Sequence, residues 1–270
     1  MGDEGNIMKT VYVCTDTVTG IFSAVYDIWK VRHKEDECSI AVRGCLEQEL
    51  FCEYVEVEET EEKVLAVEKL ICRHMGMQAY HDIYYAILSE DPKKGDAVIG
   101  TMLASRKLSD SKKIMKHLSH PKVQKVFELS RAVSNEAHCM IKFIRFRELE
   151  NGVLYSPITP KAQVLTCIAS HFEDRFPLEN WMIHDKTHHT YVVHEARKRW
   201  VLVQEEMPGY QKNKDVSAEE KFSKVSEKEK EYEHLWKSFC NTIAIKERYN
   251  PKCQRGHLPL RFRPNMVEFL

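Results

Sequence analysis

The chain has 270 residues, of which 43% are hydrophobic and 30% are charged. This length and composition allow a substantial buried core and exclude a chain that is disordered as a whole. No apolar run approaches the roughly eighteen residues of a membrane-spanning helix, and 40 basic against 41 acidic residues give no uniform field for nucleic acid. We expect a soluble globular protein without a membrane partner.

Nine cysteines are scattered along the chain without a C-x-x-C pair, and no secretory signal precedes them. Reduced thiols in a cytoplasmic protein are the simplest interpretation. Cys38, Cys45 and Cys52 follow one another at regular spacing. That spacing is wider than the two to four residues that usually separate paired metal ligands. We therefore expect no metal and no other cofactor.

The first half of the chain begins with a strand and a helix and then becomes helical. β-Branched and aromatic residues predict a strand at 10–14, and apolar spacing predicts a helix over 21–28. A half-buried strand is expected at 50–57, beside the first. From Thr60 to Ala137 the apolar spacing is helical. We expect breaks in this helical region at Gly76, Asp91-Pro92 and His120-Pro121.

The second half alternates between apolar and polar residues. Alternation predicts a strand at 140–147, and Glu150-Asn-Gly152 predicts a hairpin into a strand at 153–156. Thr159-Pro160 is expected to cap and begin a helix. Further strands are predicted at 180–184, 190–194 and 199–204. The pattern indicates a meander of about five strands with one helix inserted.

A long charged helix is expected near the C-terminus. Ser217 and Glu220 have the spacing of a capping box, and Asn250-Pro251 must end the helix. Its apolar stripe is expected to dock it on the sheet, and consists of Tyr232, Leu235, Trp236, Phe239 and Ile243. The fold class is then α+β, a mixed or antiparallel sheet of about five to seven strands with a helical middle region and this helix packed on it.

We expect two regions that together form one continuous globular unit. Residues 1–140 hold the strand, helix and helical region, and residues 141–270 hold the meander, long helix and basic tail.

The charged residues are unevenly distributed along the chain. Residues 35–68 contain twelve acidic and two basic residues. Residues 106–125 and 246–263 are basic instead. Each basic block offers lysines and arginines for phosphate contact.

The second basic block is the predicted nucleic-acid-binding segment. A basic, proline-punctuated tail can hold guanidinium groups against a sugar–phosphate backbone, and Tyr249 and Phe262 can stack on bases. The alternative is that the arginines cap helix carbonyls. The predicted binding residues are Lys246, Arg248, Asn250, Lys252, Arg255, Arg261 and Arg263.

A candidate catalytic group lies around the inserted helix. His171 and Arg175 are four residues apart and share one helical face, where Asp185 from the next strand can join them. Such a group can transfer protons or clamp a phosphate. The alternative is a buried pair of Arg175 and Asp185 that holds the helix on the sheet.

The histidines near Asp185 suggest another site. His184, Asp185, His188, His189 and His194 can place imidazoles and a carboxylate around a divalent metal. A polar hairpin turn explains the same residues. We favour the turn and predict no metal ligands.

Several stretches in the second half together point to a family. They are 144–149, 171–177, 180–185, 235–239 and 242–252, followed by Arg255 and 259–262. These stretches resemble a bacterial family of DNA-metabolism proteins with a domain of unknown function. Its members are encoded beside a radical-SAM protein, and the related domain is sometimes fused to a uracil-DNA-glycosylase-like domain. The resemblance implies a setting in DNA repair or DNA modification.

The resemblance also implies a role beside another protein. The chain lacks the C-x-x-x-C-x-x-C of a radical-SAM cluster, so it resembles the accessory partner. We expect an accessory DNA-binding protein that acts with a radical-SAM partner. The alternatives are an enzyme that acts on a damaged base or nucleotide through His171, Arg175 and Asp185, and an interaction scaffold without chemistry.

Overall fold

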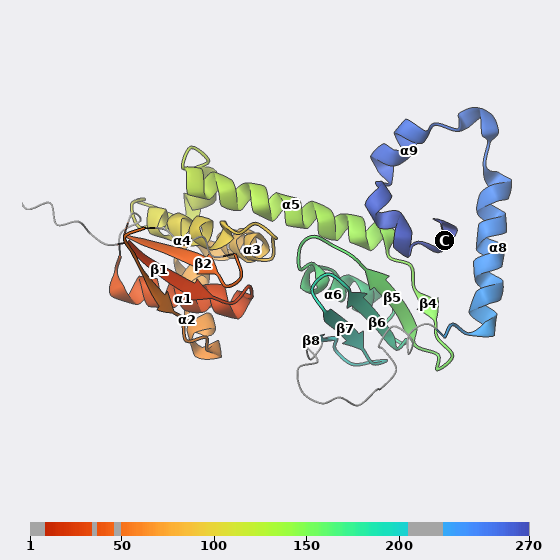
Figure 1. Cartoon of the computed structure of the whole chain (residues 1–270), viewed down its shortest axis with the longest axis horizontal. Helices are drawn as coiled ribbons and strands as arrows, with labels where there is room; N and C mark the ends of the chain where they lie inside the picture. The colour runs from red at the N-terminus through yellow and green to blue at the C-terminus, as the bar shows by residue number, and fades with distance from the viewer. Residues whose placement is uncertain (1–8, 34–36, 46–49, 205–223, 270) are drawn as a thin grey trace, which may run out of the picture. The chain divides into compact units, whose positions relative to one another are not determined.

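The computed structural model describes residues 9–33, 37–45, 50–204 and 224–269 (Figure 1). The chain divides into two compact units, Met1–Asn135 and Glu136–Leu270. The predicted α+β class is confirmed. Its strands form two sheets, one of three strands with the order β2-β1-β3 and one of five strands with the order β4-β5-β6-β7-β8.

The first unit is built on a parallel sheet. Strand β1 (Lys9–Cys14) lies between β2 (Cys38–Val42) and β3 (Cys52–Glu56) and is parallel to both. The predicted first strand and its pairing with the half-buried strand are thereby confirmed. Strand β2 was not predicted, because its short apolar run lies within the acidic segment. Helix α1 (Val18–Val31) follows β1 and begins at Thr17, whose hydroxyl accepts a hydrogen bond from the Gly20 amide.

Helices fill the rest of the first unit, as the apolar spacing predicts. They are α2 (Glu61–His74), α3 (Gly76–Ile87), α4 (Lys94–Ser105), a 3₁₀ helix (Ser111–Lys116) and the first part of α5 (Pro121–Phe143). The predicted breaks at Gly76, Pro92 and Pro121 are confirmed. The helices and the sheet share one hydrophobic cluster, in which Phe22, Ile71 and Ile83 are completely buried.

The second unit begins within α5. The prediction of a strand at 140–147 is wrong, because α5 continues to Phe143. Ala137, Met140 and Ile144 are buried at helical spacing, and this packing favours the helix over the strand. Strand β4 is limited to Arg147–Glu148. The predicted hairpin then leads through Gly152, at φ 78°, into β5 (Leu154–Ile158).

The mixed sheet contains one parallel pair. Helix α6 (Leu165–Arg175) connects β5 to β6 (Trp181–Asp185), so these two strands are parallel. Strands β7 (Thr190–His194) and β8 (Val201–Gln204) complete an antiparallel meander. The predicted helix start at Thr159-Pro160 is wrong. The amides of Lys161 and Ala162 donate to the Glu136 carboxylate, and α6 begins only after them.

Helix α8 (Glu227–Ile243) differs from the predicted long helix. It begins at Ser226, which caps the Glu229 amide, and the predicted capping box at 217–220 lies outside the described residues. The predicted docking of its stripe is wrong. Tyr232, Leu235, Trp236, Phe239 and Ile243 are between 44% and 60% exposed, and none of the helix is buried. Arg147 attaches α8 to β4 by a 2.5 Å contact with Glu233.

Short helices end the described chain. They are a 3₁₀ turn (Lys246–Arg248), α9 (Pro251–His257) and two 3₁₀ turns, Leu260–Asn265 and Val267–Phe269. None of the described helices combines the length and the apolar character needed to cross a membrane.

Candidate nucleic-acid interface

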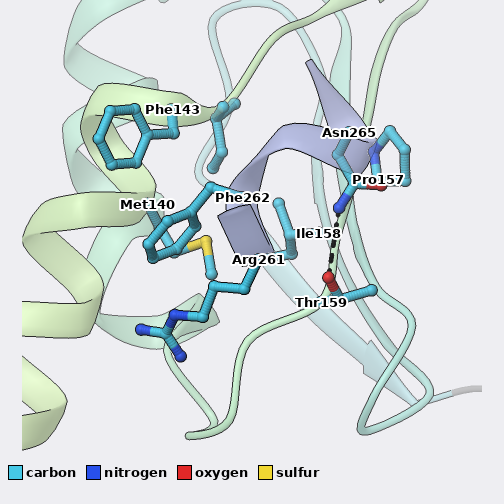
Figure 2. A pocket seen from close by; sticks show the side chains of 9 residues that line it. Met140, Phe143, Pro157, Ile158, Thr159, Arg261, Phe262 and Asn265 are labelled. Atoms are coloured by element: carbon cyan, nitrogen blue, oxygen red, sulfur yellow. Dashed lines mark hydrogen bonds between the residues drawn. The ribbon is translucent and has the colours of Figure 1, made fainter. Parts of the chain in front are cut away.

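The end of the predicted binding segment is anchored in the second unit. Phe262 is only 6% exposed, and its ring lies 5.0 Å from that of Phe143. With Met140, Ile144 and Ile158 it lines a narrow crevice (Figure 2). The prediction that Phe262 stacks on bases is wrong, because its ring is already part of the core.

Polar contacts hold the same segment at its two ends. Arg261 Nη1 donates to Glu136 Oε1 over 2.7 Å, and the Glu136 carboxylate also accepts from the Lys161 and Ala162 amides. At the other end of the crevice, Asn265 Nδ2 donates to Thr159 Oγ1 over 3.3 Å (Figure 2). These contacts join residues 261–265 to α5 and to the chain after β5.

Arg261 and Arg263 therefore have internal partners. The Arg261 guanidinium also lies 4.5 Å from the centre of the Phe262 ring. The Arg263 guanidinium lies 4.7 Å from the Phe269 ring, and its Nη2 is 3.4 Å from the Leu258 carbonyl oxygen. The contact of Arg263 with the carbonyl oxygen of Leu258, the C-cap of α9, corresponds to the structural alternative, whereas Arg261 pairs with a carboxylate. The direct binding of nucleic acid by these two arginines stays a prediction.

The preceding half of the segment is exposed. Asn250 caps α9, since its Oδ1 accepts from the Cys253 amide over 3.0 Å. Arg255 Nε donates to the Pro251 carbonyl oxygen over 3.2 Å, which positions the guanidinium beside its own helix. Tyr249 is 74% exposed, and the side chain of Lys246 lies outside the described part.

This exposed half carries positive charge that forms no ion pair within the part of the chain that the structure describes. Arg248, Lys252 and Arg255 are exposed and form no ion pair with any described residue. No acidic residue occurs between Glu247 and Glu268. In one short segment, three exposed cations can contact phosphates and the exposed ring of Tyr249 can stack on a base.

The described contacts do not bring the predicted catalytic residues His171, Arg175 and Asp185 together. Asp185 is completely buried, and its Oδ1 accepts from the Thr187 and His188 amides over 2.9 and 3.1 Å. Its Oδ2 lies 2.6 Å from His188 Nδ1. The partner of Asp185 is thus His188 from the following turn, and not Arg175 as the sequence suggested.

The topology explains this difference. The C-terminal part of α6 lies at the start of β6, where the Phe172 and Trp181 rings are 6.3 Å apart. Asp185 ends the same strand, about 13 Å from Trp181 at 3.3 Å per residue. His171 and Arg175 remain exposed. The catalytic role of the three residues stays a prediction, and no described contact unites them.

Two of the other histidines, His184 and His194, are buried and pack against aromatic rings of the sheet, whereas His189 is exposed. His184 stacks on Tyr191 at 4.2 Å, and its Nδ1 lies 3.0 Å from the Tyr155 hydroxyl. His194 stacks on Trp181 at 4.9 Å, and its Nδ1 bonds to the Glu179 carbonyl oxygen. In the described parts of the chain, no three His, Cys, Asp or Glu side chains are placed to hold a metal ion.

Sequence reasoning missed Glu136, which is central to the anchored segment. The signal was its place on the apolar face of α5, between Val133 and Met140, where an unpaired carboxylate is costly. Such a residue indicates a buried partner. The pattern does not reveal that this partner is Arg261, because the two are 125 positions apart.

Comparison with known proteins places the chain in a family. A search of curated proteins finds no match. The family model of a domain of unknown function, DUF4130, matches residues 92–268. The matched residues are more than half of the chain and include the C-terminal segment, so the chain belongs to the DUF4130 family.

Proposed function

We propose that the protein binds single-stranded nucleic acid through residues 248–255 and serves as an accessory protein of DNA repair or modification. One observation carries this proposal. Arg248, Lys252 and Arg255 are exposed cations without ion-pair partners among the described residues, and they accompany the exposed ring of Tyr249. The anchor at Arg261 and Phe262 holds the chain that follows residues 248–255.

The exposed tyrosine favours a single strand over a duplex. Bases in a duplex are stacked on each other, whereas a single strand can place a base on an aromatic side chain. Each phosphate contact releases counterions, so three cations that each contact one phosphate give a salt slope near −2 on single-stranded DNA. The DNA-repair setting and the radical-SAM partner rest on the resemblance of the sequence.

The binding proposal is tested by separating charge from stacking. In the full chain, Arg248→Gln/Lys252→Gln/Arg255→Gln should weaken binding to a single-stranded oligonucleotide and reduce the salt slope by about 2. Tyr249→Ala should weaken binding about tenfold and leave the salt slope unchanged. Fluorescence anisotropy over a range of salt concentrations measures both effects.

The control removes equal formal charge elsewhere in the second unit. Arg197→Gln/Lys198→Gln/Arg199→Gln should bind like the wild type, because Lys198 and Arg199 already face Glu195 and Glu173. If the control and the segment variant lose the same affinity, binding follows net charge and the proposed segment is wrong.

A specific observation also favours a protein partner. The α8 stripe exposes five large apolar side chains on one helix, and exposed apolar patches often mark interaction sites. We propose the radical-SAM protein encoded nearby as this partner. Co-purification of the two proteins should be lost in Leu235→Gln/Phe239→Gln and retained in the segment variant. Retention in both variants would remove α8 from the proposal.

The enzyme alternative receives less support from the geometry. Both Asp185 oxygens are occupied by the turn that contains His188, and His171 and Arg175 lie on an exposed helix surface. An accessory binding role requires no assembled catalytic group. Binding of nucleic acid is therefore the function that the described residues support best.

A further inference from the structure

A second cationic site lies in the first unit, where two helices end. Trp29 is in the last turn of α1, and Arg32 follows as the C-cap in the left-handed conformation, at φ 66°. Arg106 is the C-cap of α4. Trp29, Lys30, Arg32 and Arg106 line an open crevice. Its lining therefore combines three cations with one indole ring.

The Arg106 guanidinium stacks on the indole. Its Cζ lies 3.4 Å from the centre of the Trp29 ring, a distance typical of a close cation–π contact. Trp29 packs against the hydrophobic cluster of the first unit, so the stack has a fixed base. Arg106 is exposed and lines the open crevice, so a ligand can reach it.

Among the described residues, the three cations that line the crevice have no acidic partner. Lys30, Arg32 and Arg106 form no ion pair with a described residue. Burial and repulsion from the neighbouring Arg32 lower the pKa of Arg106. An anion would relieve this repulsion.

Helix capping alone does not explain the side chains. Cations are favoured near helix C-termini, where free carbonyl groups carry partial negative charge. In this crevice the caps are made by backbone amides, from Arg32 to the Ile28 carbonyl and from Arg106 to the Leu103 carbonyl. In the described parts of the chain, neither guanidinium donates to a carbonyl oxygen. Their donors remain available to a ligand.

The neighbouring basic block is partly neutralised by its own contacts. Lys113 pairs with Asp110, and Lys125 pairs with Asp91. Arg106 differs from both because its contact is with an aromatic ring. The face of a guanidinium on an aromatic ring suits a planar anionic ligand.

We propose that this crevice binds one nucleotide unit of a single-stranded nucleic acid. Arg32 and Arg106 would hold a phosphate, since guanidinium forks match its oxygens, and Lys30 would add charge. The base would stack on the guanidinium plane of Arg106 above Trp29, an arrangement that single-strand-binding proteins use. The site lies outside residues 248–255, and its evidence is independent of theirs.

The test uses the full chain and a short oligothymidylate of about ten nucleotides. Arg32→Asn removes the charge with a residue that tolerates the left-handed conformation, and Arg106→Gln removes the stacked cation. The double variant should lower affinity at least about tenfold. Lys69→Gln/Arg73→Gln, at two exposed positions of α2, removes the same charge as the matched control and should bind like the wild type. A base stacked near Trp29 should quench the tryptophan fluorescence of the protein. Trp29→Phe should therefore retain binding but show less quenching when the oligonucleotide binds.

The same double variant is also tested with Arg248→Gln/Lys252→Gln/Arg255→Gln present. A further loss of affinity in that background supports a separate site, whatever the first segment contributes. If Arg32→Asn/Arg106→Gln leaves the affinity of each background unchanged, the proposal is wrong. Thymidine monophosphate and inorganic phosphate serve as competitors. If either one binds the crevice as tightly as the oligonucleotide, the assignment to a nucleic-acid strand is wrong.

Discussion

At the scale of single residues, Glu136 should contribute strongly to stability. Its carboxylate is 7% exposed and accepts from Arg261 and from the amides of Lys161 and Ala162. Glu136→Ala leaves the Lys161 amide and the buried Ala162 amide without their acceptor and should lower the free energy of unfolding by about 2–4 kcal/mol. Glu136→Gln keeps one acceptor oxygen and should cost less. Urea unfolding measures the difference, with exposed Glu128→Ala as the neutral control.

Asp185 allows a direct comparison between the predicted and the observed partner. Asp185→Ala removes the acceptor of two amides and of the His188 ring and should cost about 3 kcal/mol. Arg175→Ala removes an exposed side chain and should change stability by less than about 0.5 kcal/mol. Thermal melts test both. If both variants lost stability by the same large amount, the result would support the predicted pairing of Asp185 with Arg175.

Asp91 should give the first unit a measurable pH dependence. Although burial opposes it, hydrogen bonds from Lys125 and the Lys93 amide lower the pKa of Asp91. A carboxyl group whose pKa is lower in the folded than in the unfolded protein stabilises the fold at pH values above its unfolded pKa. This contribution disappears as the pH falls through its folded pKa. Asp91→Asn should therefore be less stable than the wild type at pH 7 and equally stable near pH 2. A constant difference over this range would contradict the assignment.

At the scale of elements, α8 shows that an amphipathic pattern does not by itself mean that the apolar face is buried. Its stripe repeats at helical spacing, yet Leu235 is 60% exposed and Phe239 is 54% exposed. Leu235→Gln/Phe239→Gln should change the free energy of unfolding by less than about 0.5 kcal/mol per site. A docked stripe would instead lose about 2–5 kcal/mol per site. Chemical unfolding of the isolated full chain distinguishes the two outcomes.

The same scale shows what the sequence could predict. Periodicity located β1, α1, the hairpin at Gly152 and β7, because local spacing and turn residues determine these elements. Tertiary contacts determined the rest. The end of α5 depends on the burial of Met140 and Ile144, and the start of α6 depends on Glu136. For the candidate site, the sequence identified exposed Arg248, Tyr249, Lys252 and Arg255, but it could not separate them from Arg261, whose partner is distant in sequence.

At the scale of the whole molecule, the two units have separate cores. The cluster of the first unit draws on residues from Tyr12 to Leu129, and Trp181, Ile183 and Val192 are completely buried in the second unit. Helix α5 contributes Val126 to the first core and Met140 to the crevice around Phe262. Separate cores allow separate unfolding transitions, since cooperativity depends on contacts that are lost together.

Core variants should therefore move one transition at a time. In a Trp29→Phe background, the remaining tryptophans all belong to the second unit, so their fluorescence reports on that unit. Ile83→Ala should destabilise the first unit by about 2–5 kcal/mol and move the circular dichroism transition while leaving the fluorescence midpoint in place. Ile183→Ala should lower the fluorescence midpoint. Since each side chain is completely buried in its own unit, the losses should be of similar size. Both probes moving together in both variants would mean that the units unfold as one.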